Sequence, residues 1–243
     1  MKLSLFFFAF IGVLSIARAD LTVVQSIEAG GSTNRVTIKI KGERARIEIN
    51  PESSMIVDTK TGEVITLMPK DKSVLRLSAE KAKDLAYKGS VLRKDIDTSI
   101  EIVTPKPTGK KDKINGYEAE EYVAETPKYR ATYWVAKTYP DYQVILRQMK
   151  LLQNPAFASA RKPMPDYYDF PGLPIRTKIT LQGLPEATST IVSVSQASLA
   201  DSEFNVPADY AEIHLPEFEL RGPVPPGPVP PAAPPTPEKP DGQ

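Results

Sequence analysis

The sequence predicts an α+β fold that is mainly antiparallel β, with a curved sheet wrapped around one long and one short helix. Apolar and polar residues alternate with the period of a half-buried strand in several segments between residues 36 and 135, and again after residue 175. Turn-forming residues separate these segments, and one substantial amphipathic helix is expected late in the chain. This order of elements argues against alternating βαβ units.

The first expected strands form two hairpins. Apolar residues occupy every second position on both sides of Gly42-Glu43, which gives the first hairpin one buried face. Asn50-Pro51 ends its second strand, because proline cannot continue a central ladder. Asp58 and Gly62 are the turn formers of the next loop. The expected strands of the two hairpins span residues 36–41, 44–49, 55–57 and 63–67.

A short helix and a meander are expected next. Residues 73–77 form a short strand, and Ser78 can cap a short helix over residues 79–87, with Glu80 near its positive end. Asn115-Gly116 is a strong hairpin signal. The strands of this region are expected at residues 98–103, 111–114, 117–124 and 129–135.

The long helix is expected over residues 140–153, with Pro140 in its first turn. Large apolar and aromatic residues recur there at spacings of three and four, which gives the helix one face to bury. Sheet resumes at residues 175–181, where Ile175, Thr177, Ile179 and Leu181 share one face, and continues at 188–194.

Residues 1–19 have the pattern of a secretory signal peptide. Lys2 precedes an apolar run over residues 3–16, and Ala17-Arg18-Ala19 forms an A-x-A cleavage box. The run is shorter than the about 20 apolar residues that a membrane span needs. The chain has no cysteine, so no lipobox is present. We expect cleavage after Ala19 and a soluble periplasmic or secreted protein that does not span a membrane.

The rest of the chain is expected to form one domain and a tail. No linker-like stretch divides residues 20–215, so a single core is the simplest interpretation. Residues 221–243 contain ten of the 24 prolines and little that could form a core. We expect residues 216–243 to form a disordered proline-rich tail. The alternative is that the tail is a spacer or contacts an envelope protein.

Charge and composition exclude several functions. Basic and acidic residues number 31 and 30, so the concentrated positive charge of a nucleic-acid binder is absent. With no cysteine and His214 as the only histidine, Ser-His and Cys-His catalysis and the common zinc sites are excluded. No nucleotide-binding motif occurs. We therefore expect no catalytic residues, no metal and no cofactor.

Two charged groups keep minority interpretations open. A carboxylate-based hydrolase needs only two acids brought together by the fold. The local candidates are Asp166 and Asp169, and then Glu118, Glu120 and Glu121. Acids that alternate along a strand are usually its solvated face, so a non-enzyme is favoured. Lys106, Lys110, Lys111 and Lys113 are interpreted as a basic loop, with attraction to anionic lipid or cell-wall polymer as the alternative.

Aromatic residues are concentrated between residues 117 and 142. This stretch holds six of the ten tyrosines and the only tryptophan. They either pack the sheet against the helix or line a cavity, since ligand sites are mostly apolar with a few polar groups. The candidate lining residues are Tyr117, Tyr133, Trp134, Tyr142, Ile145 and Met149.

Several short blocks resemble an exported bacterial domain family of unknown function, the domain of unknown function 4412 family. They occur in the family's order and cover about residues 21–212. Asp209 stands where the closing phrase of the family leads us to expect glycine. The blocks are IKGERARIE at 40–48, IVDTKTG at 56–62, INGYE at 114–118, WVA at 134–136, GLP at 172–174 and FNVPADY at 204–210.

That family is similar in fold to the LolA and LolB lipoprotein carriers, in which a half-open antiparallel barrel covers helices and holds acyl chains. The resemblance therefore implies a LolA-like half-barrel. The apolar-faced sheet, the amphipathic helix and the aromatic cluster lead us to expect a hydrophobic or amphiphilic ligand, such as a lipid or an acylated protein, held between sheet and helix. No functional residue of the carriers matches a position here, and one fold hosts many functions. The second hypothesis is an envelope interaction protein that uses its proline-rich tail.

Overall fold

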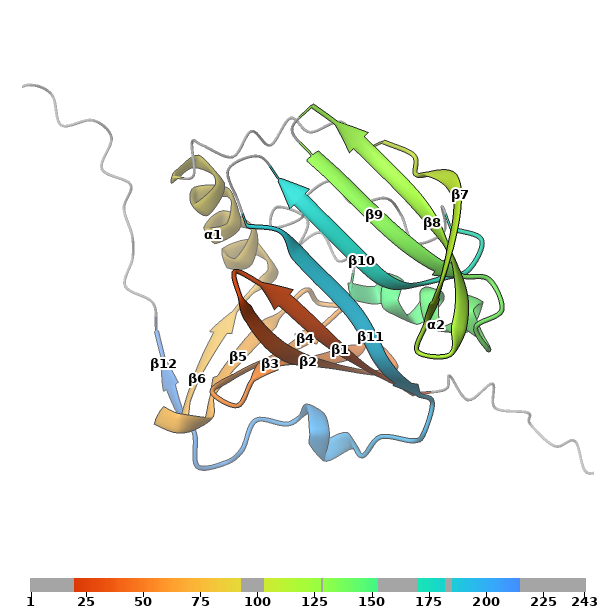
Figure 1. Cartoon of the computed structure of the whole chain (residues 1–243). Coiled ribbons are helices and arrows are strands. Elements are labelled where there is room, and N and C mark those ends of the chain that lie inside the picture. Colours follow the sequence, from red (N-terminus) through yellow and green to blue (C-terminus); the bar gives the residue numbers. More distant parts are fainter. Residues whose placement is uncertain (1–19, 93–102, 128, 153–169, 182–184, 215–243) are drawn as a thin grey trace, which may run out of the picture.

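The computed structural model describes residues 20–92, 103–127, 129–152, 170–181 and 185–214. In these residues two α-helices accompany one sheet (Figure 1). The helices are α1 (Ala79–Leu92) and α2 (Tyr142–Met149). The strands are β1 (Leu21–Ala29), β2 (Ser32–Lys41), β3 (Arg44–Asn50), β4 (Ser53–Asp58), β5 (Val64–Met68), β6 (Ser73–Leu77), β7 (Lys106–Ile114), β8 (Tyr117–Thr126), β9 (Tyr129–Ala136), β10 (Leu173–Leu181), β11 (Ala187–Ser195) and β12 (Ala211–Ile213).

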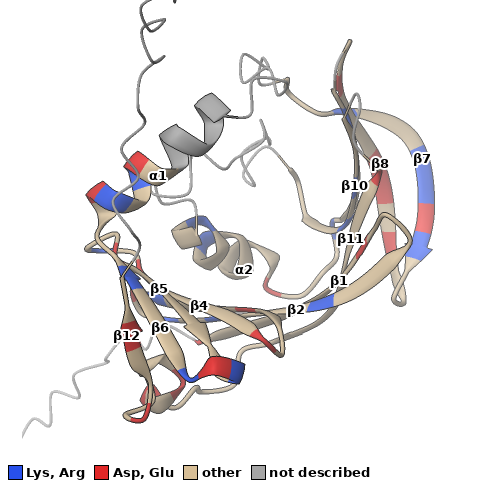
Figure 2. Ribbon diagram, turned by 90° about the vertical axis from the view of Figure 1, so that its left-hand side faces the viewer, with Lys and Arg blue, Asp and Glu red and all other residues tan. Residues whose placement is uncertain are grey.

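The twelve strands are ordered β12-β6-β5-β4-β3-β2-β1-β11-β10-β9-β8-β7. Every neighbouring pair is antiparallel except β12 with β6, which is parallel. The sheet is open and strongly curved, and α2 lies in its hollow (Figure 2). The mainly antiparallel α+β fold with a curved sheet is therefore confirmed.

The sequence analysis missed β1, which pairs with β2 on one side and β11 on the other. Leu21 and Val23 are fully buried and share one face with Gln25 and Ile27, because the pairing of β1 with β2 is continuous. The register with β11 shifts between Val24 and Gln25. On β11 the extra residue is Val192, which is 45% exposed. The bulge therefore breaks the period of two on β11 and not on β1. In the sequence of β1, the apolar Val24 on the other face and the polar Gln25 hide the alternation.

The expected helix lengths are reversed in the structure. The short helix expected at 79–87 is α1, which has 14 residues and includes Gly89 in its interior. The long helix expected at 140–153 is α2, with 8 residues and a 3₁₀ turn at Lys150–Leu152. Asp141 has a left-handed φ of 51°, so α2 starts only at Tyr142. Pro140 therefore lies before the helix, and not in its first turn where we expected it.

Two further expectations need comment. The strand expected at 98–103 lies outside the described residues except for Val103, which is not in a strand. The lysines from Lys106 to Lys113 do not form a loop, because all of them lie on β7 at one edge of the sheet. Gly109 has a φ of 80°, and the register with β8 shifts between Pro107 and Lys111. This bulge keeps an irregular, exposed segment within the sheet.

The main core lies between α2 and the concave face of the sheet. Directly paired residues in a ladder share one face, and successive residues alternate. Val23 and Ile38 are such a pair, as are Ile40 and Ala45, and all four are buried in one cluster with Ile145 of α2. The apolar face predicted for the first hairpin is therefore the face that packs on the helix.

The convex face is covered in part by residues 196–213, which we call the C-terminal strap. Figure 1 shows this blue segment running from the end of β11 under the first strands to β12. Phe204 is buried in a small second core with Ile56, Leu67 and Val74. Asp209, at the position where we expected glycine, pairs with Lys72 at 2.9 Å. The strap thus closes the outer side of β4–β6.

Ion pairs fasten the strap to β2 and β3. Lys39 Nζ lies 2.8 Å from Glu203 Oε2 and 3.1 Å from Glu48 Oε1. Asp201 Oδ1 accepts from Arg44 Nη2 at 3.0 Å and lies 3.2 Å from Lys41 Nζ. Burial lowers the pKa of Lys39, but its hydrogen bonds to Glu203 and Glu48 outweigh that effect and raise it overall. The polar positions of the first hairpin are therefore contacts of the strap.

Replacing Phe204 by alanine should release the strap. Phe204 is 5% exposed, so Phe204→Ala should lower the free energy of unfolding by about 3 kcal/mol, as for other buried phenylalanines. Urea denaturation measures the loss, and limited proteolysis should cut residues 196–213 first. Ser202→Ala, at an exposed strap position, is the control and should change stability by less than about 0.5 kcal/mol. Equal stability of both variants would contradict this account.

Asp201 should make the strap sensitive to acid. The hydrogen bond and charge of Lys41, followed by Arg44, lower the pKa of Asp201 below its ordinary 3.8. The stabilisation is thus present above pH 3.8 and is lost as the pH falls through the lowered pKa. Asp201→Asn should be less stable than the unchanged chain at pH 7, and the difference should shrink in urea denaturation as the pH falls below 3.8 and through the lowered pKa. Asp71→Asn is the control. A loss of stability in Asp201→Asn that does not depend on pH, or an equal loss in Asp71→Asn, would refute the role of the ion pair.

Candidate functional site

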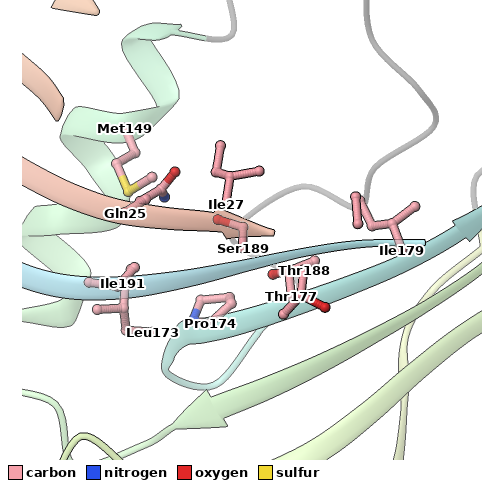
Figure 3. A pocket seen from close by; sticks show the side chains of 11 residues that line it. Gln25, Ile27, Met149, Leu173, Pro174, Thr177, Ile179, Thr188, Ser189 and Ile191 are labelled. Carbon is pink, nitrogen blue, oxygen red and sulfur yellow. The ribbon is translucent and has the colours of Figure 1, made fainter. Parts of the chain in front are cut away.

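A cavity of about 260 Å³ lies between the end of α2 and the concave face of β1, β10 and β11 (Figure 3). Its walls combine apolar side chains with a few uncharged polar ones. The lining residues are Gln25, Ile27, Met149, Leu173, Pro174, Thr177, Ile179, Ala187, Thr188, Ser189 and Ile191. The volume is close to the lower end of the range for small-molecule sites, about 300–1,000 Å³.

Helix α2 positions the helical wall of the cavity. Ile145, Leu146 and Met149 recur at helical spacing and are each at most 4% exposed. Ile145 and Leu146 fill the centre of the main core, while Met149, in the last turn, also reaches the cavity. The cavity therefore begins where the helix ends and the apolar sheet continues beyond it.

The register of the strands arranges the floor of the cavity in rows. Thr177 of β10, Ser189 of β11 and Ile27 of β1 pair across three neighbouring strands. Ile179 pairs with Ala187 in the row on one side. On the other side Ile191 pairs with Gln25. A polar centre is therefore flanked by apolar side chains at both ends.

Two β-bulges shape this floor. One separates Val24 from Gln25 and leaves Val192 exposed, which keeps both Gln25 and Ile191 on the cavity side. The other separates Pro174 from Arg176 opposite β9. Bulges increase local bending and twist. Both bulges therefore lie in the part of the sheet that forms the cavity floor.

The structure places four of the six candidate lining residues around α2. Ile145 and Met149 are buried in the main core, and Tyr117 and Tyr142 are partly buried against it. Tyr117 stacks on Tyr139 with ring centroids 4.5 Å apart. Only Met149 of the six lines the cavity. Tyr117, Tyr142 and Ile145 thus pack the sheet against the helix, and their contact with a ligand stays a prediction.

The remaining two candidates, Tyr133 and Trp134, are neighbours on β9 and project to opposite faces. Tyr133 is buried on the concave side, where its hydroxyl lies 3.0 Å from that of Tyr129 and its ring 4.8 Å from that of Phe170. Trp134 is partly buried against the main core, and it pairs with Arg176, whose guanidinium lies 6.0 Å from the indole ring. They cannot therefore line one cavity together.

Sequence analysis missed most of the residues that line the cavity. The alternation in residues 175–181 did place Thr177 and Ile179 on one face, so part of the signal was present. No sequence pattern pointed to Gln25 and Ile27 as lining residues, because β1 was not predicted. Ser189 lay in an expected strand, but its face is set by pairing with Thr177 and Ile27.

The three glutamates of β8 that were considered for catalysis form ion pairs with lysines. Glu118 pairs with Lys111 at 2.9 Å, and that hydrogen bond lowers the pKa of Glu118. Glu121 lies 3.6 Å from Lys110. Glu120 pairs with Lys137, and Asp166 and Asp169 lie outside the described residues. A lowered pKa does not suit a general acid, which needs a raised one.

The described residues offer few groups for other chemistry. They contain no group of three or more His, Asp or Glu side chains that could hold a metal ion. His214 is exposed. Burial raises the pKa of Tyr129, and burial followed by the charge of Tyr117 raises that of Tyr139. No helix in the described part of the chain is long and apolar enough to cross a membrane.

A family model described as "Domain of unknown function (DUF4412)" matches residues 13–210. This confirms the resemblance seen in the sequence blocks. The search of curated proteins found no match.

Solved structures are similar only at low identity. PNGF-II matches with 13% identity and a TM-score of 0.37, over 80% of this chain and 31% of that one. The Pseudomonas aeruginosa MucA/MucB complex matches with 9% identity and a TM-score of 0.41, over 82% and 60% of the two chains. A LolA superfamily protein from Nitrosomonas europaea matches with 11% identity and a TM-score of 0.29, over 76% and 89%. This chain thus spans about a third of the PNGF-II chain, and no argument about function rests on these similarities.

Anchoring of α2 can be tested with neighbouring substitutions. Ile145 is 1% exposed, whereas Val144 is 36% exposed. Ile145→Ala should lower the free energy of unfolding by about 3 kcal/mol, because it leaves a cavity in the main core. Val144→Ala should lower it by less than about 0.5 kcal/mol. If urea denaturation gave both variants the same loss, α2 would not be packed as described.

Proposed function

Because the chain belongs to the DUF4412 family, whose description states no activity, we propose a function from the geometry of its cavity. The protein binds a hydrophobic or amphiphilic ligand, such as a lipid or an acylated protein, between the sheet and α2. The observation that carries this proposal is the cavity of about 260 Å³ lined by Met149 and the concave face of β1, β10 and β11. Ligand sites are typically concave and mostly apolar, as this one is.

The size and walls of the cavity favour a slender ligand. Ile27, Leu173, Ile179, Ile191 and Met149 supply apolar contacts from four different elements. The volume is small for a complete lipid, so the cavity takes part of an alkyl or acyl chain. Burial of such a chain stabilises the complex by about 0.8 kcal/mol for each methylene removed from water.

The role is binding and not catalysis. The carboxylates of β8 that were candidates for a hydrolase are paired with Lys110, Lys111 and Lys137. Thr177 and Ser189 supply hydroxyls at the cavity, but the described lining holds no side chain that could serve them as a general base. This supports a non-enzymatic carrier or binding protein.

We place this activity outside the cytoplasm, in a single domain. The signal-peptide pattern in residues 1–19 and the absence of cysteine support export in soluble form, to the periplasm or beyond. Residues 20–215 would be the binding domain. The alternative, an envelope interaction protein that uses its proline-rich tail, depends on residues 216–243, which lie outside the described part of the chain.

Filling the cavity should abolish ligand binding. Nile red, a neutral apolar dye, should bind the purified protein with increased fluorescence, and lipid extracts of the protein should contain a ligand detectable by mass spectrometry. Ser189→Phe places a ring on the cavity floor and should weaken dye binding at least tenfold. Val192→Phe, at the exposed bulge on the same strand, should leave it unchanged. An empty extract together with no dye binding by the unmodified protein would refute the proposal.

A further inference from the structure

Three polar side chains of the cavity have no hydrogen-bond partner among the described residues. Gln25, Thr177 and Ser189 line its floor, and none of their side chains makes a hydrogen bond with another residue in the described part of the chain. Other polar side chains near this part of the sheet do form hydrogen bonds. Arg176 donates to Thr190 Oγ1 at 3.3 Å, and Asn115 donates to the carbonyl of Ile191 at 2.6 Å. Buried or half-buried polar groups are normally paired with protein or water. The three groups on the cavity floor are therefore available to a ligand.

These three groups form a continuous polar band. Thr177 and Ser189 are directly paired, and Gln25 pairs with Ile191, two residues from Ser189 on the same face. Figure 3 shows all three on the cavity side of their strands. Apolar side chains surround this band: Ile27 lies beside Ser189, Ile191 lies beside Gln25, and Ile179, Met149 and Leu173 complete the lining. A ligand that fits would carry a polar group between or beside apolar parts.

The described lining contains no charged side chain. The neighbouring charges on β10 alternate away from the cavity, since Arg176 faces Trp134 and Thr190. Lys178 is engaged by Glu186 at 2.9 Å. A carboxylate or an ammonium placed on the floor would therefore lose water without meeting an opposite charge, which costs far more than burying a hydroxyl that is hydrogen-bonded.

We infer that the cavity is selective for ligands with an uncharged hydrogen-bonding group, a hydroxyl or an ester, attached to an alkyl chain. The inference rests on the proposed function and narrows its ligand class. Hydroxyl side chains donate and accept, and the amide of Gln25 does both through separate atoms. Together they satisfy a neutral alcohol or ester. The same set excludes free fatty acids in their ionised form.

The test compares two probes of equal chain length. Binding of 1-decanol and of decanoate to the purified full chain is measured at pH 8 by isothermal titration calorimetry. At this pH the carboxyl group is ionised. Decanol should bind at least tenfold more tightly than decanoate. Decanoate binding as tightly as decanol, or more tightly, would overturn the inference while leaving the proposed function intact. Binding of neither probe would overturn both.

Variants assign the selectivity to the polar band. The double variant Thr177→Val with Ser189→Ala removes two hydroxyls with little change in shape and should weaken decanol binding about tenfold. Ser193→Ala, at an exposed position of the same strand, is the matched control and should bind decanol normally. Thr177→Lys should raise the affinity for decanoate by supplying a cation. Unchanged decanol binding by a folded double variant would also overturn the inference.

Discussion

The pairing of β1 with β11 is the interaction on which the rest of the structure depends. It joins β1–β6 to β7–β11 in one sheet, because β1 also pairs with β2 and β11 also pairs with β10. The bulge between Val24 and Gln25 lies in this pairing, so the same contact both unites the two halves and bends them. Without it, α2 would have no continuous concave face to pack against, and the cavity would have no floor.

Both faces of the bent sheet have apolar areas to bury, and different segments cover them. On the concave side, α2 contributes Ile145, Leu146 and Met149 to the main core. On the convex side, the C-terminal strap contributes Phe204 to a second core and is held by ion pairs at Lys39 and Asp201. Since α2 has only 8 residues, it covers part of the concave face and leaves the surface of β10 and β11 beyond Met149 to form a cavity.

The character of the cavity follows from the register. Pairing places Thr177 beside Ser189, and it turns the charged residues of β10 to the other side of the sheet. The result is a mostly apolar hollow with an uncharged polar band, and the aromatic cluster of β8 and β9 lies outside it. Tyr122, Tyr129, Tyr133 and Phe170 instead pack on one another further along the concave face. Aromatic density in a sequence thus indicated core packing here, as it commonly does.

By itself, the sequence determined the antiparallel class, the first two hairpins and the buried face of α2. These follow from local periods of two and 3.6 and from turn residues such as Asn115-Gly116. Tertiary structure decided the existence of β1, the lengths of the helices and the residues of the cavity. Strand pairing is a non-local interaction, and a single bulge reverses the faces of all residues beyond it. Ordinary alternation along β9 separates Tyr133 from Trp134. Strand pairing, in contrast, brings together Gln25, Thr177 and Ser189 from distant parts of the chain.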